Sequence, residues 1–263
     1  MFSIFLLLLS IFYNKHLSKE NIIFGIRPVI EAIKAGKEID RILIQNGLKG
    51  ENSWELKKLI SELQIPSQYV PLEKLNKISQ KNHQGVICFV SEISYQPLEN
   101  LLPMIFEKGE DPLLLILDRI TDVRNFGAIT RTAECAGVNA IIIPSKGSAR
   151  INADAVKTSA GALYKIPICR EDNLKQTIEF IKASGIEIIA CTEKATEPYH
   201  SVSYNKPVAI IIGSEEDGIS QEYLKISDKM VMIPLKGEIE SLNVSVAAGI
   251  ILFEATKQRN FKA

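Results

Sequence analysis

The pattern of apolar and polar positions differs between two parts of the chain. In residues 21–95, short strand-like runs such as IDRILIQNG alternate with amphipathic segments such as SWELKKLISELQI. From residue 112 onward, the strand-like runs are apolar on both faces, as in PLLLILD. Strands of this second kind are typical of a parallel sheet covered by helices on both sides. The pattern therefore predicts two α/β units of different character.

The order of the predicted elements supports this division. Residues 21–95 read as strand, helix, strand, helix, strand, short helix and strand, which predicts a small α/β layer. Residues 112–263 alternate strands and helices throughout, which predicts an open and largely parallel sheet. Residues 96–111 contain Pro97 and Pro103 and end in a charged, glycine-containing stretch, so we expect a linker there.

Residues 1–20 form an apolar N-terminal extension that contains the run FSIFLLLLSIFY. This run is shorter than the roughly 20 residues that a membrane-spanning helix needs. No Lys or Arg precedes it and no small-residue cleavage site follows it. Three interpretations compete: an uncleaved membrane-associating segment, a weak signal peptide, or an extension from an upstream start that takes no part in the fold. We favour the last, and with it no membrane partner.

Composition narrows the classes of site. The chain has 31 Lys and Arg against 31 Asp and Glu, so any surface for nucleic acid must be a local patch. Its four cysteines are far apart and form no CxxC pair, and its three histidines are widely separated. Neither a metal site nor a disulfide framework is therefore expected, and the cysteines are typical of a reduced, cytoplasmic protein.

Candidate chemistry lies in four loops that follow predicted strands of the second unit. In open α/β sheets, ligands bind beyond the carboxyl ends of the strands. The loops are TDVRNFG, CTEKA, GSEEDGIS and PLKGEIESLN. Neither G-x-G-x-x-G nor G-x-x-x-x-G-K-[ST] occurs, so a conventional dinucleotide site and a P-loop are disfavoured.

Several polar residues of these loops are candidates for a site. Asn125, at the predicted start of a helix, and Arg131 are offset by about 120° on a regular helix, so they project together only if Asn125 precedes it. Glu215 either lies in a solvated acidic turn or orients a guanidinium through two hydrogen bonds. Ser241 or Asn243 is expected to cap the last helix, and alone this cap is a sufficient explanation of the turn.

Chemistry in the first unit is sparser. Gly25, Arg27 and residues 81–84 stand in loops at predicted strand ends. They are either solvated loop groups or an edge that contacts RNA, because Arg and Lys bind phosphates while His and Gln reach bases and sugars. We select Arg27 and His83 as the RNA-binding candidates.

Three segments resemble, in order and spacing, the three motifs of the SpoU/TrmH family of RNA 2′-O-ribose methyltransferases, within the SPOUT class. They are NFGAITRTAECAG, IIIGSEEDGIS and IPLKGEIESLNVSVAAG, of which the third is highly specific. GIRPVIEAI and NHQGV resemble the small, L30e-like substrate-binding domain of the branch that methylates guanosine in 23S rRNA. Val123 departs from the proline of many relatives, which affects the stiffness of the loop rather than a reacting group.

The resemblance implies a fold, a cofactor and an assembly. The fold is a SPOUT-type parallel sheet whose C-terminal segment forms a deep trefoil knot. The cofactor is S-adenosyl-L-methionine, held in a bent form largely by backbone atoms near Thr192, Gly213, Ile233 and Leu242. Family members are homodimers with the last helix in the interface, so one subunit is expected to complete the site of the other. RNA is the expected partner and DNA is not.

The resemblance also implies roles for the candidate residues. Arg131 matches the arginine to which the family proposal gives the role of general base, with Asn125, Glu215, Ser241 and Asn243 positioning it, the ribose or the cofactor. A neutral guanidinium is costly at physiological pH. A second interpretation therefore stays open, in which Arg131 binds the neighbouring phosphate and orients the hydroxyl while another group takes the proton.

Alternatives to methylation of a 23S rRNA guanosine also remain. A tRNA ribose methyltransferase is the first, although the additional N-terminal unit favours structured rRNA. A non-catalytic RNA-binding or ribosome-assembly protein of the same fold is the second, and the intact set of candidate residues argues against it. A nucleotide-dependent oxidoreductase is the third, which the missing glycine fingerprint disfavours.

Overall fold

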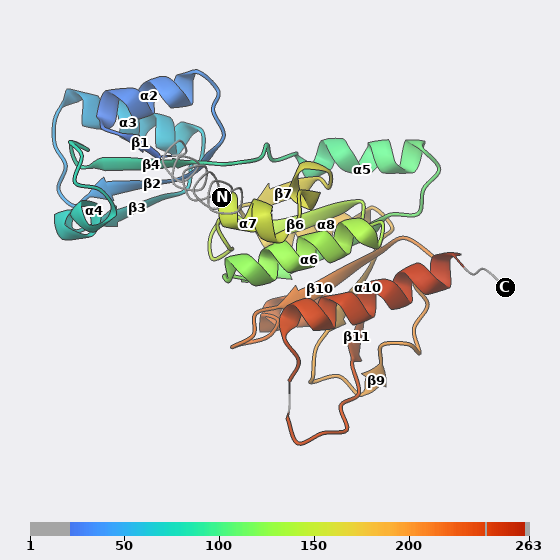
Figure 1. Ribbon diagram of the computed structural model, residues 1–263. Coiled ribbons are helices and arrows are strands. Elements are labelled where there is room, and N and C mark those ends of the chain that lie inside the picture. Colours follow the sequence, from blue (N-terminus) through green and yellow to red (C-terminus); the bar gives the residue numbers. More distant parts are fainter. Residues whose placement is uncertain (1–21, 240, 261–263) are drawn as a thin grey trace, which may run out of the picture. The chain divides into compact units, whose positions relative to one another are not determined.

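Figure 1 shows a computed structural model, which describes residues 22–239 and 241–260. The chain divides into two compact units: unit 1 runs to Ser94 and includes Ile151–Ala153, and unit 2 contains Tyr95–Arg150 and the residues from Asp154 onward. The predicted extension, residues 1–20, lies outside the described residues. No helix in the described part of the chain is both long and apolar enough to cross a membrane.

Unit 1 is built on a four-stranded sheet with the order β1-β4-β2-β3. Strand β4 runs antiparallel to β1 and β2, whereas β2 and β3 are parallel. The elements follow the predicted order: β1 (Ile22–Phe24), α2 (Ile26–Lys34), β2 (Ile39–Gln45), α3 (Glu51–Glu62), β3 (Ser67–Val70), α4 (Leu72–Ile78) and β4 (Val86–Val90).

Helical periodicity explains how unit 1 closes its core. Val29 and Ile33 lie one turn apart on α2, and together with Leu56 of α3 they pack on Ile42 and other residues of the sheet. A smaller cluster, which includes Leu75 of α4, occupies the other face of the sheet. Because helices cover both faces of the sheet, we expect a ligand of unit 1 to contact its strand ends and loops.

Unit 2 is a seven-stranded sheet with the order β7-β6-β5-β10-β8-β11-β9. Every neighbouring pair of these strands is parallel, which confirms the predicted parallel sheet. The elements are α5 (Leu98–Glu107), β5 (Leu113–Asp118), α6 (Val123–Cys135), β6 (Ala140–Pro144), α7 (Ala153–Thr158), η1 (Ala162–Tyr164), β7 (Ile168–Glu171), α8 (Leu174–Ala183), β8 (Glu187–Cys191), β9 (Glu197–Pro198), β10 (Val208–Gly213), α9 (Gln221–Ile226), β11 (Lys229–Met232) and α10 (Val244–Asn260).

Strands β5 and β10 form the centre of the sheet, and every residue of both is buried. Helices α5 and α8 cover one face, with Leu102 and Ile178 in its core. Helices α6 and α10 pack side by side (Figure 1). Because β10 lies between β5 and β8, a late part of the chain enters the middle of a sheet that earlier strands begin. The trefoil knot itself stays a prediction.

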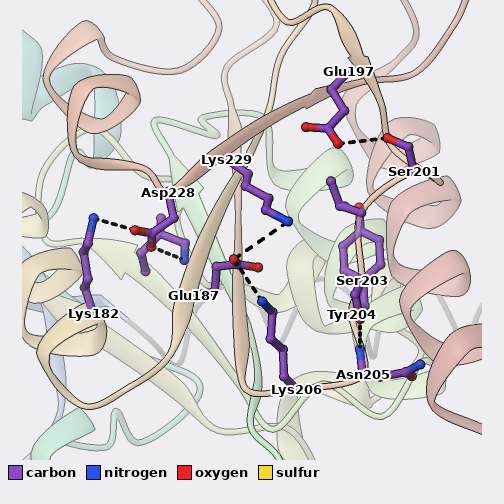
Figure 2. Close-up of polar contacts among 12 residues, drawn as sticks. Lys182, Glu187, Glu197, Ser201, Ser203, Tyr204, Asn205, Lys206, Asp228 and Lys229 are labelled. Carbon is purple, nitrogen blue, oxygen red and sulfur yellow. Dashed lines mark hydrogen bonds and ion pairs between the residues drawn. The ribbon is translucent and has the colours of Figure 1, made fainter.

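Ion pairs hold the amino-terminal edge of this sheet (Figure 2). The Glu187 carboxylate accepts a hydrogen bond of 3.0 Å from Lys206, and Lys182 lies 2.6 Å from Asp228. Burial of Asp228 opposes its ionisation, but the bonds from Lys182 and from the Ile188 N–H outweigh this effect and lower the pKa of the carboxyl. The charged groups here are paired with one another, whereas the polar loops at the carboxyl ends face a cleft.

Candidate functional site

Asp122 determines where the first site helix begins. Its carboxylate accepts hydrogen bonds from the backbone N–H groups of Arg124, at 2.9 Å, and Asn125, at 2.8 Å. Helix α6 therefore begins at Val123 rather than near Asn125, because Asp122 supplies an N-cap that the sequence interpretation did not assign. Asn125 thus lies inside the first turn, directly after the carboxyl end of β5.

Three of the predicted catalytic residues meet at this point. The Asn125 side-chain amide donates to the Glu215 carboxylate. Asn243 donates to the Asn125 oxygen at 3.1 Å and to Glu215 at 3.3 Å. These residues belong to three segments far apart in the chain, so their mutual hydrogen bonds are a product of the fold. We call this group the Asn–Glu–Asn cluster.

Asn243 also caps the last helix, as the sequence predicted. Its side-chain oxygen accepts from the Ser245 N–H at 2.9 Å, and its backbone oxygen accepts the first helical bonds of α10, from Val246 and Ala247. The cap fixes the orientation of the amide, so that its nitrogen points toward Glu215. Ser241 lies exposed in the same turn and does not share the cap.

A cleft of about 500 Å³ opens beside the cluster. The four residues selected for cofactor binding all line this cleft: Thr192, Gly213, Ile233 and Leu242. Ser241 and Glu215 line it as well. The walls combine apolar side chains with carboxylates and backbone, so the cleft suits a ligand with an apolar ring and a positive charge. Burial raises the pKa of the Cys191 thiol in this wall to about 11, which keeps the thiol neutral.

The acidic loop, residues 214–218, forms one wall of the cleft and turns back sharply on itself. The Gly218 N–H donates to the Ser214 oxygen at 3.0 Å, and Gly218 has a φ of +67°. A Cβ atom on Gly213 would lie only 2.1 Å from the carbonyl carbon of Gly218. Glycine is therefore required at position 213, because the two ends of the loop touch there.

Arg119 is a residue of the site that the sequence interpretation missed. Its guanidinium reaches Asp118 at 3.2 Å, Asp217 at 2.8 Å and the Gly218 carbonyl at 3.2 Å. Burial opposes the positive charge, but the two carboxylates outweigh it and raise the pKa of Arg119. An arginine after an apolar strand gives no signal of such a role in the sequence.

Arg119 also lines a second, smaller cavity of about 230 Å³. Asn125, Gly147 and most of the acidic loop line the same cavity. The acidic loop therefore separates two spaces, of which the larger is the candidate cofactor cleft. Glu215, at the tip of this loop, borders both.

Arg131 does not join the cluster within one chain. It is exposed on α6 and lines neither of the two cavities, and its side chain has no hydrogen bond or ion pair to any other residue that the structure describes. Both Asn125 and Arg131 belong to the regular helix, so the angular offset that the sequence indicated separates them.

The RNA-binding candidates of unit 1 differ from each other. Arg27 is exposed at the start of α2. His83 is buried, its Nδ1 accepts from the Gly85 N–H at 3.1 Å, and its Nε2 lies 2.9 Å from the Asn76 oxygen. Since both ring nitrogens have partners within unit 1, the geometry gives His83 a role in holding its own loop, and direct contact of His83 with RNA stays a prediction.

Within residues 22–239 and 241–260, no group of three or more His, Cys, Asp or Glu side chains has a geometry that could hold a metal ion. The candidate site accordingly consists of amide, carboxylate, hydroxyl and guanidinium groups.

Comparison with known families matches both units. The SpoU rRNA Methylase family matches residues 112–253, and a family described as RNA 2′-O ribose methyltransferase substrate binding matches residues 22–96. The chain is 34% identical over 239 residues to a putative TrmH family tRNA/rRNA methyltransferase, YacO, of Bacillus subtilis, covering 90% of this chain and 96% of the relative.

A second relative and a solved structure carry more specific descriptions. The 23S rRNA (guanosine-2′-O-)-methyltransferase RlmB of Vibrio parahaemolyticus is 36% identical over 241 residues, covering 90% of this chain and 96% of the relative. The crystal structure of an AdoMet-bound rRNA methyltransferase from Sinorhizobium meliloti superposes with a TM-score of 0.59 at 26% identity, covering 95% of this chain and 92% of that one.

Proposed function

Because this chain belongs to the SpoU rRNA methylase family, whose members are S-adenosylmethionine-dependent RNA 2′-O-ribose methyltransferases, we propose that it methylates a guanosine in 23S rRNA. The observation that carries the proposal is the Asn–Glu–Asn cluster at the mouth of the cleft. It supports an enzyme rather than a binding protein that has kept the fold, because polar side chains fixed by one another are typical of a site that orients a substrate.

The cofactor cleft fits S-adenosylmethionine by its chemistry. Bound there, the cofactor supplies an electrophilic methyl group on a sulfonium centre. Ile233 and Leu242 offer apolar contacts to a ring, and Thr192 and the backbone at Gly213 offer polar ones. Carboxylates in the same wall suit the positive charge of a sulfonium.

The residues of the cluster orient the acceptor. With its carboxylate held by Asn125 and Asn243, Glu215 is fixed between the cofactor cleft and the smaller cavity. We assign Asn125, Glu215 and Asn243 to positioning of the ribose and of the cofactor, with Ser241 beside them. Such preorientation of the reacting groups lowers the barrier because less motion must be lost at the moment of reaction.

We propose that the protein acts as a homodimer and that Arg131 serves the site of the partner subunit. Arg131 is exposed and lines neither cavity of its own chain. Val246 and Phe253 on α10 are 49% and 51% exposed, and these apolar side chains support an interface along the last helix. Arg131 then either accepts the proton of the 2′-hydroxyl or holds the adjacent phosphate.

We assign recognition of RNA beyond the reacting nucleotide to the first unit, residues 21–95. The methyltransferase domain, residues 112–263, follows residues 96–111, whose helix α5 packs on the sheet of unit 2. The family match over residues 22–96 supports this assignment. Arg27, exposed in the first turn of α2, is suited to a phosphate.

The function is tested with labelled S-adenosylmethionine and RNA from cells that lack the protein. Label in 23S rRNA, at a guanosine that resists alkaline cleavage after reaction, is the expected result. Label in tRNA alone would instead support the tRNA ribose methyltransferase. Cofactor binding with no transfer to any cellular RNA would contradict the enzymatic proposal and favour a role in ribosome assembly.

A further inference from the structure

Arg119 has a backbone conformation that arginine rarely adopts. Its φ is +59°, in the left-handed region that favours glycine. Backbone strain of this kind persists where the surrounding structure holds it, and it is common at functional sites. The left-handed backbone of Arg119 therefore points to a role for the contacts that its side chain makes.

The guanidinium of Arg119 uses each of its three nitrogens on a different partner. Nε bonds Asp118 of β5, Nη1 bonds Asp217, and Nη2 donates to the Gly218 oxygen. Two of these partners lie in the acidic loop. The planar fork of arginine matches such divergent acceptors, whereas the single ammonium of lysine does not.

Asp118 extends the connection to the chain just after the acidic loop. Its side chain is only 2% exposed, and its second oxygen accepts from the Ser220 N–H at 2.7 Å. The Asp118–Arg119 pair thus ties the acidic loop to the carboxyl end of the central strand β5 at Asp217 and Gly218, and it ties the chain that follows the loop at Ser220. Glu215 stands on the part of the loop that these bonds support.

We propose that Arg119 is a positioning residue that holds the acidic loop in register with the Asn–Glu–Asn cluster. The expected effect on turnover rests on the proposed function. The expected effect on cofactor binding does not, because the acidic loop lines the cofactor cleft. Loss of the guanidinium lets the loop move at Asp217 and Gly218. Glu215 then leaves its place beside Asn125 and Asn243, and the cleft wall shifts with it.

Arg119→Gly gives the sharpest test, because glycine adopts a φ of +59° without strain and so removes the side chain alone. We expect weaker cofactor binding and a fall in kcat of roughly ten- to a hundredfold, as for misplacement of a site by the order of 1 Å. Arg119→Lys retains the charge, and relative to Arg119→Gly it is expected to recover only a small part of the cofactor affinity and of kcat.

Lys206→Met is the matched control. It removes an ion pair of 3.0 Å, to a largely buried carboxylate, at the opposite edge of the sheet (Figure 2). A general loss of stability would lower cofactor affinity and kcat equally in both variants, so unfolding midpoints are recorded for each. Unchanged affinity and kcat in folded Arg119→Gly would overturn the proposal.

A double variant tests whether Arg119 acts through its contact with Asp217 in the acidic loop. If Arg119 acts through the loop, Asp217→Asn should weaken cofactor binding less in the Arg119→Gly background than in the wild type. Independent, additive effects would contradict this coupling. Cofactor affinity is measured by calorimetry without RNA, so absence of turnover in the wild type would refute the proposed function while this measurement still decides the role of Arg119.

Discussion

Asn243 combines a structural and a functional contact in one amide group. Its oxygen caps α10, and its nitrogen donates to Glu215 and Asn125. The cap orients the nitrogen, so the start of the helix and the geometry of the site depend on the same side chain. Substitutions that retain one half of the amide separate these two roles.

Asn243→Asp keeps an oxygen for the cap but replaces the donor with a negatively charged acceptor facing Glu215. Asp is as good an N-cap as Asn, so we expect an unfolding midpoint close to that of the wild type. Turnover is expected to fall by about a hundredfold, because Glu215 loses a hydrogen bond and is repelled.

Asn243→Ala is the companion variant. It removes both contacts, so it should lose turnover to a similar degree and about 1 kcal/mol of stability as well. Thermal unfolding and single-turnover kinetics measure the two effects separately. Equal losses of stability in Asn243→Asp and Asn243→Ala would contradict the role of Asn243 as the cap.

Some residues of the site could be predicted from the sequence, and others could not. Asn125, Glu215 and Asn243 could be selected because their motifs have a specific order and spacing, and their contacts follow from the fold. Arg119 could not, since a left-handed backbone at an arginine leaves no mark in the sequence. The burial of His83 could not be predicted either, because it depends on how its loop packs against Asn76 of α4.

At the scale of elements, the acidic loop depends on the close approach of its two ends. Strand β10 ends at Gly213, and Gly218 lies against it. The loop is short and is tied to β5 by Asp118 and Arg119, so it behaves as an extension of the sheet rather than as an independent segment. A change at its base should therefore be felt across the whole cleft.

Gly213→Ala is predicted to weaken cofactor binding. The added methyl group would lie 2.1 Å from the backbone of Gly218, which must move to relieve the overlap. Overpacking typically costs about 1–3 kcal/mol. If that cost falls on the bound state, Kd rises by about five- to 150-fold, as calorimetry would measure.

Gly249→Ala provides the matched control for this prediction. Its new Cβ would lie 3.7 Å from a Thr132 methyl group, an ordinary contact, and alanine favours the helix α10. Cofactor affinity should be unchanged and stability slightly increased. If Gly213→Ala bound the cofactor as well as Gly249→Ala does, the close packing at the base of the loop would have no role in binding.

The elements themselves were largely predictable, because short continuous apolar runs such as LLLILD and VAIIIG, rich in branched residues, are typical of strands buried on both faces. The start of α6 was not. Both Asp122 and Asn125 are good N-cap residues, and the choice between them depends on which carboxylate or amide reaches the free N–H groups.

On the scale of the whole molecule, the proposed dimer assigns Arg131 to the partner's site. This arrangement makes a specific prediction for mixtures of inactive variants. Arg131→Ala and Asn125→Ala should each be inactive alone while still folding. If Arg131 acts across the interface, a mixed dimer has one site with both defects and one with none.

Random re-pairing of these two variants should restore about a quarter of wild-type turnover, since half of the dimers are mixed and each has one intact site. The variants are mixed under mild denaturant, refolded together, and assayed beside each variant refolded alone. Turnover that stays at the background of the separate variants would place Arg131 in the site of its own chain.

The position of β10 has a consequence for how the protein is made. Leu113 of β5 pairs with Val208 of β10, so β5 obtains this neighbour only after the ribosome has delivered residues much later in the chain, whereas Ile189 of β8 pairs with the nearby Ile210. Pairings so distant in sequence slow folding. Until β10 emerges, the nascent chain exposes two long apolar strand edges, which makes it a natural client for chaperones.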